Sequence, residues 1–175
     1  MFREEASLTR RVALTGLLGA LALTLSFLES LLPPLPVPGA RLGLSNLATM
    51  TALSALGLPA ALTITLAKAL FALLRGGTAF WMSLCGGVLS TLAMALCMRL
   101  LRGHIGAVGV GILGAVAHNA GQLAAAMVLF DDSLLVYAPW LLIAAVAAGT
   151  ATGLVLRVVL PRVRGLCIKN DIFKG

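Results

Sequence analysis

Long apolar stretches separated by short polar breaks constrain this chain more than any other feature of its sequence. One stretch runs from Val12 to about Leu32, and others of similar length cover residues 79–101, 105–130 and 134–160. A transmembrane helix needs about 20 consecutive apolar residues. Only 11% of the 175 residues are charged, whereas a soluble domain has about 25%. This excludes a soluble globule, a disordered chain and a disulfide scaffold, and it predicts an integral membrane protein.

Prolines and glycines divide the apolar sequence into six predicted helices. Four prolines between residues 33 and 38 cannot continue a helix and end the first one. Ser45 or Asn46 is expected to cap the second helix, and Pro161 to end the sixth. The second and third helices are short, so they are either full spans with ragged ends or half-length elements buried against neighbours. The predicted helices cover residues 12–32, 47–56, 60–74, 79–101, 105–130 and 134–160.

The distribution of Lys and Arg predicts which ends of the helices face the cytoplasm. With the N-terminus inside, the inner segments hold ten Lys and Arg, and the outer loops hold only Arg41 and Arg75. Cytoplasmic loops of membrane proteins carry such an excess, so we predict an N-in/C-in topology. The net charge of +7 therefore reflects topology rather than a nucleic-acid partner. The predicted parts are a cytoplasmic N-terminal tail (1–10), a six-helix membrane domain (11–160) and a basic cytoplasmic C-terminal tail (161–175).

Polar side chains inside the predicted helices are few, and their predicted depths agree. Ionisable and amide groups are costly within a membrane, which makes each one a candidate for function. In the N-in topology they come from four helices and lie from mid-membrane outward. This predicts a polar cavity open to the outside, with the proline-rich loop and the Asp131–Asp132 loop as its lid. The candidate substrate-binding residues are Glu29, Arg41, Asn46, Lys68, Arg75, His118, Asn119 and Gln122.

Most of these residues also have a structural interpretation. Glu29 could be an interfacial carboxylate and Arg75 an anchor at the membrane rim. His118 and Asn119 could form hydrogen bonds between helices. Tyr137 is typical of the aromatic belt at a membrane interface. The sequence leaves these alternatives open.

Small residues recur at helical spacing in two places. Gly16, Ala20 and Thr24 form one row on the first predicted helix, and Gly149 and Gly153 form another on the sixth. Such rows let helix backbones approach closely, either within one chain or between chains. We interpret both rows as internal packing or as a docking face for a partner membrane subunit, with Gly16, Ala20 and Thr24 as the candidate docking residues.

No motif of an enzyme is present in the sequence. It has no P-loop, no HExxH and no nucleophile elbow. The Asp131–Asp132 pair lacks the further acidic residue that would hold Mg²⁺ with a diphosphate. Cys85, Cys97 and Cys167 fit no zinc or haem spacing. We therefore expect a binding protein rather than an enzyme, without a metal site, and the sequence identifies no cofactor.

Four stretches of the sequence resemble one family of membrane proteins. They are ESLLP (29–33), PGARLGLSN (38–46), AFWMSLCGG (79–87) and AHNAGQL (117–123). They resemble the Gx transporter family, often labelled heptaprenyl diphosphate synthase component I, which is related to the substrate-binding S components of energy-coupling factor (ECF) transporters. The resemblance covers residues 10–160. It implies a six-helix protein of the bacterial cytoplasmic membrane with a ligand site in the outer half of the bilayer. The matching motif positions are Glu29, Arg41, Asn46, His118, Asn119 and Gln122.

Three functions are compatible with this resemblance. The first is substrate binding for transport: a small molecule, anionic or related to isoprenoids or quinones, is captured from the outer side. Its partners would be the lipid bilayer, the ligand, and a coupling membrane subunit with cytoplasmic ATPases. The second is an accessory membrane subunit in polyprenyl diphosphate or quinone metabolism. The third is a membrane component of electron transfer linked to a flavin or quinone.

Overall fold

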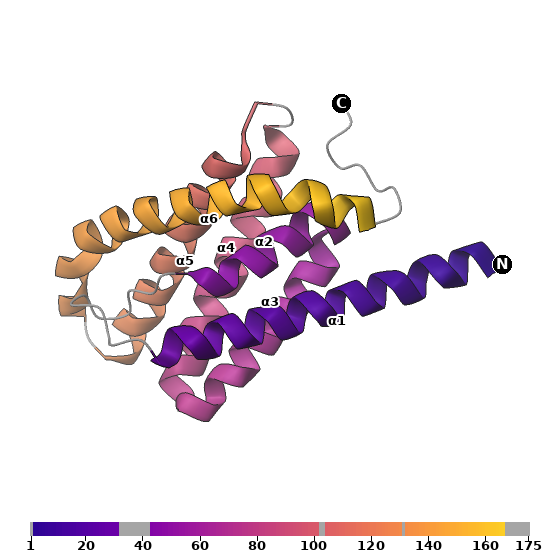
Figure 1. The fold of residues 1–175 in the computed structure, drawn as a ribbon. Helices are drawn as coiled ribbons and strands as arrows, with labels where there is room; N and C mark the ends of the chain where they lie inside the picture. Colours follow the sequence, from indigo (N-terminus) through magenta and orange to yellow (C-terminus); the bar gives the residue numbers. More distant parts are fainter. Residues whose placement is uncertain (1, 32–42, 102–103, 131, 167–175) are drawn as a thin grey trace.

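The structure of the protein is a computed structural model that describes residues 2–31, 43–101, 104–130 and 132–166. Within these ranges the chain is helical and contains no strand (Figure 1). The elements are α1 (Phe2–Leu31), α2 (Leu44–Leu56), α3 (Leu58–Ala72), the 3-10 segment η1 (Leu73–Arg75), α4 (Gly77–Leu100), α5 (Ala107–Leu129), the 3-10 segment η2 (Asp132–Tyr137) and α6 (Ala138–Leu166). This confirms the prediction of an all-α bundle of six helices. Arg41 and the predicted lid at 33–38 lie outside the described residues.

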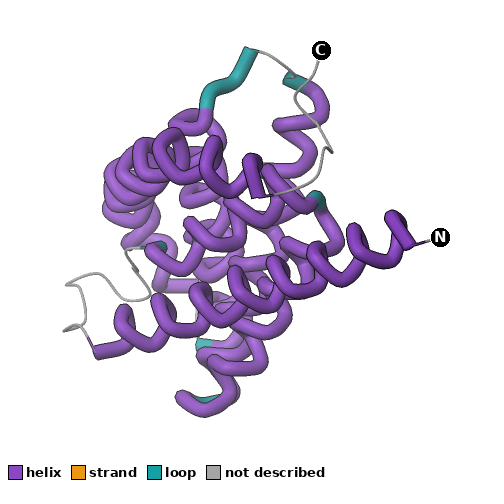
Figure 2. The backbone as a smooth tube through the Cα atoms, turned by 45° about the vertical axis from the view of Figure 1, so that its right-hand side comes forward, coloured by secondary structure: helices purple, strands orange, loops and turns teal. Residues whose placement is uncertain are grey.

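Successive helices run in alternating directions through the bundle. Figure 1 shows the start of α1 and the end of α6 at one end, and the turned view in Figure 2 agrees. The α3–α4 turn, the end of α5 and the start of α6 lie at the opposite end. We call this opposite end the outer end, because the Lys and Arg distribution predicts that it faces outside. The arrangement is that of a multi-pass membrane protein with both terminal helices ending on the same side.

Five of the six helices are long and apolar enough to cross a membrane, and α2 is the exception. Its 13 residues span about 20 Å, less than the roughly 30 Å hydrocarbon core of a bilayer. Residues 48–56 of α2 are all buried, and α2 contacts each of the other five helices. The second helix is therefore a half-length element in the centre of the bundle. The third, extended by η1, reaches the length of a full span.

Glycines bring the backbones of α4, α5 and α6 into close contact. A Cβ added at Gly149 would lie 2.5 Å from the Cα of Ile112, and one added at Gly153 would lie 2.5 Å from the Cα of Val108. On the other side of α5, a Cβ at Gly121 would lie 2.7 Å from the carbonyl oxygen of Cys85. Close backbone approach is a main source of helix association in lipid. The Gly149–Gly153 row thus packs inside the chain, which is one of its two predicted roles.

Side-chain hydrogen bonds also join three pairs of helices. The Ser90 hydroxyl donates to the Gly114 carbonyl at 2.8 Å and joins α4 to α5. The hydroxyls of Thr65 and Thr91 are 2.9 Å apart and join α3 to α4. Arg11 donates from its guanidinium to the Leu56 carbonyl at 2.9 Å, which joins α1 to the end of α2.

The largest differences between predicted and observed helix ends are at the start of the first helix and the end of the sixth. The first helix begins at Phe2 rather than Val12, because the polar residues that precede Val12 are mostly good helix formers. The sixth continues through Pro161 to Leu166, so the prediction that Pro161 ends it was wrong. Proline removes one N–H, which would otherwise bond to the Arg157 carbonyl four residues earlier. The remaining hydrogen bonds of the helix carry it past the proline.

Gly149→Ala should destabilise the protein, because the added methyl group would force α5 and α6 apart. Overpacking of this kind costs about 1–3 kcal/mol. The matched control is Gly16→Ala on α1, where an added Cβ meets no atom within 4 Å and helix propensity favours alanine by about 1 kcal/mol. Thermal unfolding in detergent should show a lower midpoint for Gly149→Ala only. Equal midpoints for the two variants would contradict the close α5–α6 contact.

Candidate functional site

The predicted site residues that the structure describes fall into two groups. Glu29, Asn46, Lys68 and Arg75 come from α1, α2, α3 and η1, and we call them the charged cluster. His118, Asn119 and Gln122 lie on α5 and are each more than nine-tenths buried. Arg41 lies outside the described residues. The two groups have different surroundings.

The charged cluster contains a cation buried within a membrane-spanning helix. Lys68 is only 6% exposed, and its Nζ donates to Oδ1 of Asn46 at 3.0 Å. This bond ties α3 to the first turn of α2 across the interior. A Lys within a span is rare and is a candidate for function. The amino-terminal N–H groups of α2, which carry partial positive charge, lie in the same first turn as Asn46.

Glu29 caps α2 from the neighbouring helix. One oxygen of its carboxylate accepts a hydrogen bond from the Leu44 backbone N–H at 2.7 Å. The prediction that Ser45 or Asn46 caps α2 was wrong, because the helix begins at Leu44 and both residues lie within its first turn. The preceding Gly43 has φ 72°, in the left-handed region, and its position provides no side-chain cap. The acceptor therefore has to come from α1.

The same carboxylate acts electrostatically on Arg75, which is exposed at the end of η1. Glu29 thus faces both an exposed cation and a helix N-terminus. This places Glu29 in a structural role at the outer end, in addition to its predicted role at a ligand site.

The polar residues of α5 are fixed by packing on both sides. His118 and Gln122 are one helical turn apart, and both pack on Gly86 of α4: a Cβ there would lie 3.1 Å from His118 Nδ1 and 2.7 Å from Gln122 Cγ. Asn119 donates from Nδ2 to the Leu141 carbonyl at 3.0 Å and joins α5 to α6. The interhelical hydrogen bond that the sequence offered as an alternative for Asn119 is present.

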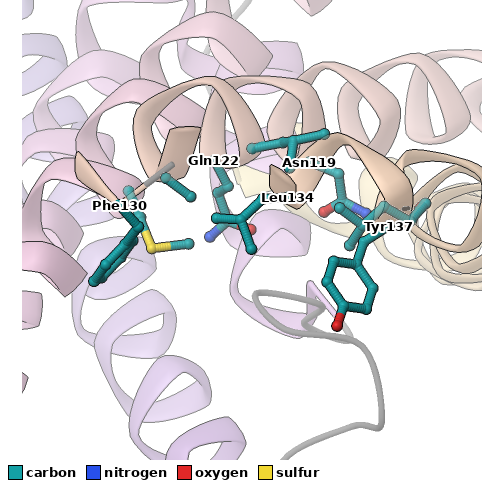
Figure 3. Close-up of a pocket in the computed structure, with 9 residues that line it drawn as sticks. Asn119, Gln122, Phe130, Leu134 and Tyr137 are labelled. Atoms are coloured by element: carbon teal, nitrogen blue, oxygen red, sulfur yellow. Dashed lines mark hydrogen bonds between the residues drawn. The ribbon is translucent and has the colours of Figure 1, made fainter. Parts of the chain in front are cut away.

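A cavity of about 420 Å³ lies beside Asn119 and Gln122, between α4, α5, η2 and α6. Figure 3 shows their side chains on the side of α5 where Leu134 and Tyr137 lie, with Phe130 farther along the cavity. Most of the lining is apolar. The lining residues are Met82, Asn119, Gln122, Leu123, Ala126, Phe130, Leu134, Tyr137 and Leu141.

Most of this lining was not predicted from the sequence. Tyr137 was interpreted as an interfacial residue, and the apolar residues were not singled out. A signal was present on α5, where the lining residues Asn119, Gln122, Leu123, Ala126 and Phe130 follow the spacing of one helix face. The residues of the charged cluster do not belong to this lining. Asn46 instead borders a void of about 10 Å³ with Gly114 and Ala115 of α5, one turn before His118.

A second, larger hollow lies between α1 and α3 and has a volume of about 820 Å³. Gly16 and Ala20, two of the three residues predicted for docking, line it together with residues of α3. Thr24 lies one turn further along α1, and its hydroxyl donates to the Ala20 carbonyl at 2.9 Å. The hollow begins near Arg11 and the α2–α3 turn, at the end of the bundle opposite the outer end.

Metal-binding side chains do not gather in the part of the chain that the structure describes. No group of three or more His, Cys, Asp or Glu residues could hold a metal ion there. The polar groups that the fold brings together are instead amides, hydroxyls and the charged cluster, which suit hydrogen bonding to an organic ligand.

These features define an α-helical multi-pass membrane protein with an apolar cavity near its outer end. Residues 18–159 match the model of the family described as heptaprenyl diphosphate synthase component I, and the chain belongs to this family. The match covers about half of α1, all of α2 to α5 and most of α6. No curated protein and no solved structure matches the chain.

Glu29→Ala should lower stability, because the Leu44 N–H would lose its acceptor. Loss of a helix N-cap typically costs about 0.5–2 kcal/mol. Glu29→Gln is the matched control, since its amide oxygen can still accept the bond although the charge is gone. The midpoint of thermal unfolding should fall clearly for Glu29→Ala and less for Glu29→Gln. If both variants unfold like the wild type, the capping role is wrong.

Proposed function

We propose that the protein captures a small molecule from the outer side of the membrane and serves as a substrate-binding subunit for transport. The observation that carries this proposal is the cavity of about 420 Å³ near the outer end. Small-molecule sites have volumes of about 300–1,000 Å³ and are lined by apolar and aromatic side chains with a few placed polar groups. Asn119 and Gln122 are such polar groups in a lining that is otherwise mainly apolar.

The positive charge of the charged cluster favours a ligand that carries an acidic group. Lys68 is buried at the amino-terminal turn of α2, where partial positive charge and a cation together favour an anion. In this proposal Arg41 and Arg75 add positive charge at the outer end, and His118 and Asn46 add hydrogen-bonding groups. The acidic group would lie at the charged cluster and the remainder of the ligand in the cavity.

Transport would require a partner, because the sequence has no nucleotide-binding motif. The hollow between α1 and α3 supports a docking site for a helix of a coupling membrane subunit with cytoplasmic ATPases. Gly16 and Ala20 line this hollow, and small residues allow the backbone of a partner helix to come close. The hollow also lies toward the predicted cytoplasmic side, where ATPases would act. In this proposal the protein binds its ligand and catalyses no reaction.

An accessory role in polyprenyl diphosphate or quinone metabolism is the second candidate. The family description implies a partner enzyme component, and the apolar lining of the cavity would suit part of an isoprenoid chain. The two candidates predict different bound molecules. A water-soluble ligand supports transport, whereas a prenyl lipid supports the accessory role.

The test is to identify what the cavity holds when the protein is purified from its membrane. Met82→Trp should displace the bound molecule, because Met82 lines the cavity and the larger indole would fill it. Leu96→Trp is the matched control, since Leu96 is on the same helix and is 58% exposed. Mass spectrometry of the extracts should show a molecule retained by wild type and Leu96→Trp and lost from Met82→Trp. The same molecules in all three samples would contradict the proposal.

Lys68→Met should weaken binding of that ligand without unfolding the protein, since it removes the charge and keeps an unbranched side chain. A hydrogen bond to a charged group contributes about 1.5–3 kcal/mol, which corresponds to roughly tenfold to a hundredfold in affinity. Arg99→Met, at the exposed inner end of α4, is the control and should bind like wild type. Titration calorimetry measures both. If Lys68→Met binds the ligand as tightly as the wild type, Lys68 does not contact the ligand.

A further inference from the structure

We infer that the part of the ligand in the cavity near α5 is an uncharged, ring-bearing group that donates one hydrogen bond to Oε1 of Gln122. This inference rests on the proposed function and names the chemical class that the cavity accepts. It concerns only the cavity and not the charged cluster. Three properties of the lining lead to it.

The first property is an acceptor without a donor. Gln122 is 3% exposed and lines the cavity. Its Oε1 is buried and accepts no hydrogen bond from any of the described residues. Buried polar atoms in native proteins are almost always hydrogen-bonded, and an exception needs an explanation. An amide oxygen can only accept, so the complementary ligand atom is the donor of a hydroxyl or an N–H group.

The second property is the absence of charge among the described side chains that line the cavity. The side chains around the cavity are apolar or aromatic, apart from the amides of Asn119 and Gln122 and the hydroxyl of Tyr137. Among these described side chains an anion would lose its hydration without gaining a positive partner, and a cation would find no carboxylate. The amide of Asn119 is engaged with the Leu141 carbonyl through its donor Nδ2. The cavity therefore favours a neutral group over an ionised one.

The third property is the placement of aromatic and sulfur-containing side chains. Phe130 and Tyr137 lie toward opposite ends of the cavity, and Leu134 lies between them (Figure 3). Aromatic rings prefer offset or edge-to-face contacts with other rings, and the Met82 thioether in the same lining packs well against a ring edge. A flat apolar ring between these side chains, with its donor directed at Gln122, meets all three properties.

Three matched probes separate these requirements: 2-naphthol, 2-methoxynaphthalene and 2-naphthoate. Each has the same bicyclic ring, and they differ in offering a neutral donor, no donor or a negative charge. Each is titrated into the full-length protein in lipid nanodiscs, and the signal from empty nanodiscs is subtracted. Wild type should bind 2-naphthol about tenfold more tightly than 2-methoxynaphthalene, as expected for one hydrogen bond to a buried acceptor. It should bind 2-naphthoate most weakly.

Gln122→Leu should bind the naphthol and the methyl ether equally, because it removes the acceptor and keeps a side chain of similar size. Gln122→Met is a second variant with the same expectation, in case the first is poorly folded. Asn119 is left unchanged, since its bond joins α5 to α6. Met82→Trp should abolish binding of all three probes if they occupy the cavity.

Several outcomes would overturn the inference. Tightest binding of 2-naphthoate that Met82→Trp abolishes would mean that the cavity takes an anion, and the proposed function would survive. If both Gln122 variants still prefer 2-naphthol, Gln122 does not accept the hydrogen bond from the ligand. If no probe binds wild type above the empty nanodiscs, the assigned chemical class is wrong. Failure of the proposed function is separate, since it depends on the molecule that the purified protein retains.

Discussion

α1 holds both ends of the central helix with charges of opposite sign, and the arrangement of the bundle depends on this. Glu29 accepts the Leu44 N–H at the start of α2, and Arg11 donates to the Leu56 carbonyl at its end. Helix ends leave backbone groups without partners, and lipid offers none. Both charges also oppose the partial charge of the helix end that they contact. A half-length helix can therefore be buried within the bundle with one backbone group at each end bonded to α1.

The position of α2 explains the character of its neighbours. Because α2 touches all five other helices, its surface consists largely of small and hydroxyl-bearing residues that permit close contact from every side. Its short length leaves room beside its first turn, and Asn46 meets Lys68 there. A full-length second helix would place that turn nearer the membrane rim. The burial of Lys68 is thus a consequence of a short helix held at both ends.

The fold could be predicted from the sequence because its main signals are local. Apolar length, proline breaks and Lys and Arg counts fix the number and direction of the helices without any knowledge of contacts. The cap of α2 could not be predicted in this way. Its acceptor, Glu29, lies 15 residues earlier in the sequence, whereas the cap rule considers only residues at the start of the helix. The prediction that Pro161 ends α6 failed for a different reason, since a proline removes a single backbone N–H and the helix can continue through its other hydrogen bonds.

The candidate site was only partly predictable. Polar residues within an apolar helix can be recognised in the sequence, whereas the apolar residues that shape a cavity cannot. Asn119 and Gln122 stand out as amides in an apolar helix. Met82 and Leu141, which line the same cavity, look like ordinary membrane residues until α4, α5 and α6 are placed together. Among the described residues, the predicted site residues therefore have two kinds of surroundings. The charged cluster packs around the start of α2, and the cavity is mainly apolar.

The glycines explain why the cavity lies where it does. Gly111, Gly149 and Gly153 hold the inner parts of α5 and α6 in backbone contact. Towards the outer end, beyond Gly121 on α5 and before Gly149 on α6, the facing positions carry larger side chains such as Leu123 and Leu141. Helices packed through glycines approach more closely than helices separated by leucines. α5 and α6 are therefore free to diverge towards the outer end, and η2 crosses the space between them with Leu134 and Tyr137. Sequence changes at these outer positions can alter the cavity while the glycine contacts preserve the fold, which is how one bundle could be adapted to different ligands.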